Sequence, residues 1–90
     1  MQKAMHELSI ALSLVDAVCD ELPRLGGACV QSVHVRVGAL SGVSAEALAF
    51  AFDVAAHASP IAGARIQVEQ TAGRELEVRA LEVIDAAADR

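Results

Sequence analysis

This sequence is poor in cysteine, aromatic and basic residues, and each shortage excludes a class of protein. Its only cysteines, Cys19 and Cys29, are too few for a disulfide framework and lack the Cys-x-x-Cys spacing of zinc and redox sites. Lys and Arg number 7 against 12 Asp and Glu, which argues against nucleic acid or an anionic membrane as a partner. We therefore expect a cytoplasmic protein with two reduced thiols, of which Cys19 packs in the core.

Long hydrophobic runs and enzyme motifs are also missing. No stretch reaches the ~18 apolar residues of a membrane helix. The apolar segment from Leu8 to Val15 is short, acidic residues flank it, and Val18 is too bulky for a signal-peptidase site, so we expect no signal peptide. There is no Gly-rich phosphate loop and no serine in a nucleophile elbow. The sequence therefore does not predict an enzyme.

What is present is an aliphatic domain whose periodicity alternates between helix and strand. Hydrophobic residues make up 54% of the 90 positions, enough for one small core built mainly of Leu, Val, Ile and Ala. The first apolar stripe recurs every three or four residues, as on one helix face: Leu8, Leu12, Val15, Cys19 and Leu22. Glu7 would lie in the first turn, near the positive end of the helix dipole. Pro23 and the glycines at 26–27 would end this helix.

The remaining segments predict a strand, a helix and two further strands. Alternating valines indicate a strand over 33–38, and Ser44 is a suitable N-cap for a helix through about His57 that buries Leu48, Phe52 and Ala55. Strands are expected at 64–70, with Ile66 and Val68 inward, and at 75–85. In the latter, Leu76, Val78 and Ala80 alternate before a phase change that suggests either a bulge or a strand buried on both faces. The short link at 71–74 predicts an antiparallel hairpin. The fold class is thus α/β (α+β type): two helices on a three-stranded mixed sheet, in the order αβαββ, with a frayed tail at 86–90.

Three histidines are the candidates for metal chemistry. His34 lies on the polar side of a strand and is expected at the surface, and His57 suits the negative end of a helix dipole. His6 is followed by Glu7, but adjacent helical side chains diverge by about 100° and cannot grip one ion together. A metal at His6 must therefore recruit main-chain nitrogen, which Ni(II) and Cu(II) accept in square-planar sites.

The chain contains four stretches in this order: "MHELSIALSLVDAV", "VHVRVGALSGVSAEALAFAFDV", "GARIQVEQ" and "GRELEVRALEVID". Together they resemble the HypA/HybF family of hydrogenase nickel-incorporation proteins. The resemblance covers almost all of residues 5–85. It implies a nickel-binding metallochaperone domain that delivers Ni(II) during [NiFe] hydrogenase maturation, with a HypB-type GTPase and the hydrogenase large subunit as partners. It also implies that His6 is the imidazole ligand, that Glu7 supplies an amide nitrogen or a supporting carboxylate, and that Met5 begins the site.

The sequence departs from the family pattern in two places. The zinc domain with two Cys-x-x-Cys pairs is absent at about residues 71–74, so no zinc is expected. Residues 1–4 precede Met5 as an extension: a chain that begins at Met1 has no terminal amine at Met5 and should bind nickel more weakly than one that begins at Met5. The alternative function is a HypA-like interaction module that docks a maturation partner without metal. An exposed outer strand could also pair two chains into a homodimer.

Overall fold

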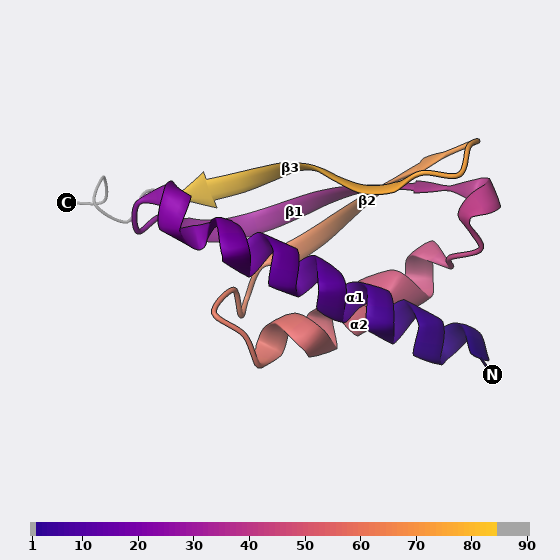
Figure 1. The fold of residues 1–90 in the computed structure, drawn as a ribbon, viewed down its shortest axis with the longest axis horizontal. Coiled ribbons are helices and arrows are strands. Elements are labelled where there is room, and N and C mark those ends of the chain that lie inside the picture. Colours follow the sequence, from indigo (N-terminus) through magenta and orange to yellow (C-terminus); the bar gives the residue numbers. More distant parts are fainter. Residues whose placement is uncertain (1, 85–90) are drawn as a thin grey trace.

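The computed structural model describes residues 2–84, with side chains from residue 6 onward. The elements are, in order, α1 (Gln2–Glu21), the 3-10 turn η1 (Leu22–Leu25), β1 (Cys29–Gly38), the 3-10 turn η2 (Ala39–Ser41), α2 (Ala45–His57), β2 (Arg65–Thr71) and β3 (Leu76–Ile84). Both helices lie on one face of the three-stranded sheet (Figure 1). The predicted fold class and the order αβαββ are confirmed. The predicted frayed tail at 86–90 lies outside the described residues.

The order of the strands differs from the prediction. β1 lies in the centre of the sheet, parallel to β2 and antiparallel to β3. The expected antiparallel hairpin between β2 and β3 is therefore wrong. Their short link crosses the end of β1: the Gly38 N–H donates to the Glu75 carbonyl at 2.7 Å, and the Leu40 N–H donates to the Gly73 carbonyl at 2.8 Å. The parallel pairing of β1 and β2 follows from the intervening α2, which carries the chain back along the sheet.

A bulge in β3 accounts for its change of hydrophobic phase. Val35 and His34 are consecutive residues of β1. Val35 lies opposite Val78 of β3, whereas His34 lies opposite Ala80. Arg79 is therefore an extra residue in β3 without a partner in β1. Of the two explanations that the sequence left open, the bulge is confirmed, and β3 is not buried on both faces. Ala80 is exposed rather than inward, because the bulge precedes it and reverses the alternation.

The core is formed where the helices cover β1. Val33, Val35 and Val37 are buried beneath the two helices, and the predicted inward residues of α2, Leu48, Phe52 and Ala55, are buried as well. Half-buried Cys19 packs against this core, as expected. Within residues 2–84, neither helix combines the length and the apolar character needed to cross a membrane.

The helix ends agree with the sequence signals except at the first one. Ser44 caps α2, its Oγ accepting the Ala47 N–H at 3.2 Å. η1, which contains Pro23, follows α1 and ends at Gly26 with a left-handed φ of 61°. α1 itself begins at Gln2, several residues earlier than predicted. Glu7 is consequently in its second turn, and the predicted interaction of Glu7 with the start of the α1 dipole is wrong.

Candidate metal centre

His6 lies on the outer side of α1, and its side chain is exposed. It borders a shallow groove of about 340 Å³ that runs beside α1 to the beginning of β3. The other lining residues are apolar or carry hydroxyl groups: Ser9, Ile10, Ser13, Leu14 and Leu76. The groove therefore offers the imidazole of His6 as its one strong nitrogen donor from a side chain.

Glu7, the next residue, points in a different direction and is fully buried. Its Oε2 accepts the main-chain N–H of Ser44 at 2.6 Å, and Ser44 in turn caps α2. The carboxylate thus lies at the N-terminal end of α2, where the helix dipole favours a negative group. Among the described residues, Glu7 Oε1 has no hydrogen-bond partner. Glu7 therefore connects the second turn of α1 to the first turn of α2.

The structure does not bring the predicted side-chain ligands together. The ring of His6 faces solvent while the carboxylate of Glu7 faces the core, in agreement with the divergence expected for adjacent helical residues. Met5 belongs to α1, but its side chain lies outside those that the structure describes. Within the described part of the chain, no group of three His, Cys, Asp or Glu side chains is arranged to hold an ion. Further donors for a metal at His6 would have to come from the main chain.

Those main-chain nitrogens belong to a helix. Because α1 begins at Gln2, the helical pattern pairs the N–H groups of His6 and Glu7 with the carbonyls of Gln2 and Lys3. An amide nitrogen that binds nickel must lose its proton, and with it its hydrogen bond. Metal binding through the amides of His6 and Glu7 therefore requires the first turn of α1 to open.

The other histidines and the cysteines lie apart from this end of the molecule. His34 is on β1, on the sheet face opposite the helices, and His57 is exposed at the end of α2. Both surface expectations are confirmed. Cys29 is exposed at the start of β1, and both cysteines are free thiols.

The comparison with known proteins connects this chain with nickel incorporation. The family model described as "Hydrogenase/urease nickel incorporation, metallochaperone, hypA" matches residues 5–76. The chain belongs to the HypA family. The hydrogenase maturation factor HypA of Chloroflexus aurantiacus is 46% identical over 66 residues, which are 73% of this chain and 58% of that protein. The HypA of Deinococcus radiodurans is 48% identical over 69 residues, which are 77% of this chain and 58% of that protein.

The matches also show how much of a HypA protein this chain spans. The chain spans a little over half the length of the curated HypA proteins that it matches. The family match begins at Met5 and ends at Leu76, the first residue of β3. The family description is that of a metallochaperone for nickel, which is a binding and transfer function rather than a catalytic one.

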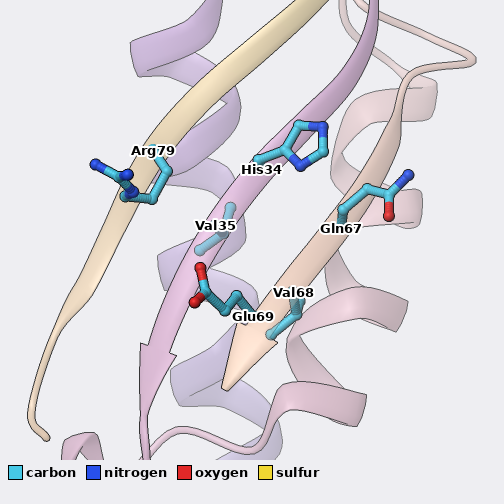
Figure 2. Close-up of a pocket in the computed structure, with 6 residues that line it drawn as sticks. All are labelled: His34, Val35, Gln67, Val68, Glu69 and Arg79. Carbon is cyan, nitrogen blue, oxygen red and sulfur yellow. The ribbon is translucent and has the colours of Figure 1, made fainter. Parts of the chain in front are cut away.

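A second group of polar residues in this HypA chain lies on the sheet face that the helices leave open. Figure 2 shows the side chains of His34, Gln67 and Glu69 on this face, around a shallow depression of about 180 Å³. Arg36 lies beside it, with guanidinium nitrogens 3.5 Å from Glu69 and 3.7 Å from Glu77. Opposite charges thus alternate across the three strands, which is typical of a solvated sheet face.

On the same face, His34 perturbs the carboxylate of Glu82. His34 Nε2 lies 3.2 Å from Glu82 Oε1. Hydrogen bonds from His34 and from Ser32, followed by the charge of His34, hold the pKa of Glu82 below its ordinary value. Because the folded-state pKa is lowered, this contribution to stability is present above the unfolded-state pKa. It is lost as the pH falls through the folded-state value.

We expect His34→Ala to raise the pKa of Glu82 towards that of free glutamate, because the variant removes the largest cause of the shift. Carboxyl-carbon NMR titration of Glu82 measures the change directly. Arg79→Ala is the control, since Arg79 lies on the same strand but does not contribute to the shift. An identical Glu82 titration in the His34→Ala variant and the parent would contradict the assignment.

Proposed function

We propose that this chain is the nickel-binding part of a HypA-type metallochaperone, which delivers Ni(II) during [NiFe] hydrogenase maturation. The observation that carries the proposal is the family match that begins at Met5, immediately before the exposed His6. A HypB-type GTPase and the hydrogenase large subunit are the proposed partners. A urease is the second target that the family description allows.

We assign the imidazole of His6 and the main-chain nitrogens of residues 5–7 as the donors to Ni(II). Met5 contributes its nitrogen, as a peptide amide in a chain that begins at Met1 or as a terminal amine in a chain that begins at Met5. Glu7 contributes its amide nitrogen, since its carboxylate is buried and accepts the Ser44 N–H. Because nickel displaces protons from these groups, affinity should rise with pH.

We expect a chain that begins at Met5 to bind one Ni(II), and to bind it more tightly than the chain that begins at Met1. The shorter form supplies an amine, and it lacks the carbonyls of Gln2 and Lys3 that hold the amides of His6 and Glu7 in the helix. His6→Ala should weaken binding at least ~10-fold in both forms, because loss of even an outer-sphere group costs that much at a metal site. Isothermal titration of both forms with Ni(II) makes the measurement.

His57→Ala is the matched control, since His57 is an exposed imidazole at the end of α2. It should leave the nickel affinity unchanged. In the Met1 form, saturation with Ni(II) should also lower the helical circular dichroism by about one turn, and His6→Ala should abolish that change. Strong, equal binding by the His6→Ala chain would refute the site.

The alternative, an interaction module without metal, predicts no nickel binding by either form and a complex with the GTPase that survives chelator treatment.

The proposed domain runs over residues 5–85, and residues 2–4 of the four-residue extension continue α1 at its N-terminal end. The zinc domain is proposed to be missing at the link after β2, about residues 71–74. No zinc is expected to co-purify.

A further inference from the structure

An apolar groove lies between the two helices on the side that faces away from the sheet. It has a volume of about 230 Å³, and every residue that lines it is apolar: Leu8 of α1 and Ala47, Phe50, Ala51 and Val54 of α2. Phe50 is 73% exposed and Val54 is 54% exposed. Leu12, one turn after Leu8 on the same side of α1, is 49% exposed. Exposed large apolar residues that gather beside one groove mark an interaction surface.

The helices that form this groove are acidic on their outer sides. The two helices contain one basic residue, Lys3 in the first turn of α1, and six acidic residues: Glu7, Asp16, Asp20, Glu21, Glu46 and Asp53. Only Glu7 among them is buried. Glu46 and Asp53 lie one helical turn on either side of Phe50, and Asp16 lies one turn after Leu12. The strands and the link between β2 and β3 carry four arginines, at 36, 65, 74 and 79, and four glutamates, at 69, 75, 77 and 82. The sheet layer is therefore close to neutral, whereas the helix layer is negative.

The lining also restricts the backbone conformation of an occupant. It consists of apolar side chains, so it offers no hydrogen-bonding group to the main chain of a docked segment. A segment that enters such a groove must satisfy its own N–H and C=O groups, as a helix does. A second copy of this chain is a poor occupant, because it would bring two acidic helix layers together.

We infer that the α1–α2 groove docks an amphipathic helix of a partner protein, with apolar residues along one face and Lys or Arg flanking them. Phe50 and Val54 are the apolar contacts, and Glu46, Asp53 and Asp16 pair with the basic flanks. The groove begins at Leu8, next to Glu7, so the docked helix lies beside the first turns of α1. The inference does not depend on nickel, because none of its contacts uses His6.

The test uses two synthetic helical peptides with the same leucine face, one flanked by lysines and the other by glutamates. Fluorescence anisotropy measures their binding to the full chain carrying His6→Ala, which keeps the result separate from the proposed metal site. The lysine-flanked peptide should bind at least ~10-fold more tightly than the glutamate-flanked one. Phe50→Ser should weaken that binding at least ~10-fold, the effect of losing one interface anchor.

Leu40→Ser is the matched control, because Leu40 is 63% exposed on η2 and lies outside the groove. It should change the affinity less than ~2-fold, as expected of residues outside an interface. The double variant Glu46→Lys/Asp53→Lys should reverse the preference between the peptides. Equal binding of both peptides, or binding indifferent to Phe50, would overturn the inference. A dimer or a vesicle complex that Phe50→Ser abolishes would instead assign the groove to a second copy or to a lipid surface.

Discussion

Replacing Gly38 with alanine should destabilise the fold by about 3–4 kcal/mol, from overpacking together with strained hydrogen bonds. The φ of Gly38 is −81°, which any residue can adopt, so the need for glycine is steric. A Cβ at this position would overlap the carbonyl of Gly73 and lie 2.8 Å from the nitrogen of Arg74. The link between β2 and β3 would have to move away, and its hydrogen bonds to Gly38 and Leu40 would lengthen or break.

Gly73→Ala provides a matched control on the other side of the same contact. Its Cβ would meet only the carboxylate of Glu75, the mobile end of a flexible side chain. We expect a change below ~1 kcal/mol, as for other substitutions that need only a surface rotamer to shift. Urea unfolding followed by circular dichroism compares the two variants with the parent. Similar urea midpoints of unfolding for Gly38→Ala and Gly73→Ala would show that the link between β2 and β3 is not packed tightly against Gly38.

This crossing also explains why the sequence could not predict the order of the strands. β2 and β3 lie on opposite edges of β1, two strand spacings or about 9.5 Å apart. The four residues 72–75 can span that distance, and they can equally form a hairpin loop. The valine pattern identified β1 and its buried face correctly, but alternation carries no information on which neighbour pairs with which strand.

The early start of α1 was, by contrast, available in the sequence. Residues 2–5, Gln-Lys-Ala-Met, are all strong helix formers, which favours extending the helix before Glu7. The burial of Glu7 follows from the same register. Stepping back four residues at a time along the buried stripe from Val15 gives Ala11 and then Glu7. What periodicity could not supply is the partner of that carboxylate, because Ser44 is 37 residues away in the chain.

That partner makes Glu7 the residue with the other large expected effect. Glu7→Ala should lower the free energy of unfolding by about 2–4 kcal/mol. The variant leaves a cavity between the helices and removes the acceptor of the Ser44 N–H, each of which is costly in a buried position. It also removes the negative group from the N-terminal end of α2. Thermal or urea unfolding of the metal-free chain measures the loss.

Glu7→Gln separates the roles of shape and hydrogen bonding from that of charge. Glutamine keeps the volume of the side chain and an oxygen that can accept the Ser44 N–H, so we expect a loss of only about 1 kcal/mol. Asp16→Ala, which removes an exposed carboxylate from the same helix, should change stability by less than ~0.5 kcal/mol. If Glu7→Ala were as stable as Asp16→Ala, the carboxylate would not join the helices. The buried position of Glu7 would then leave its side chain free for another role, including that of a ligand.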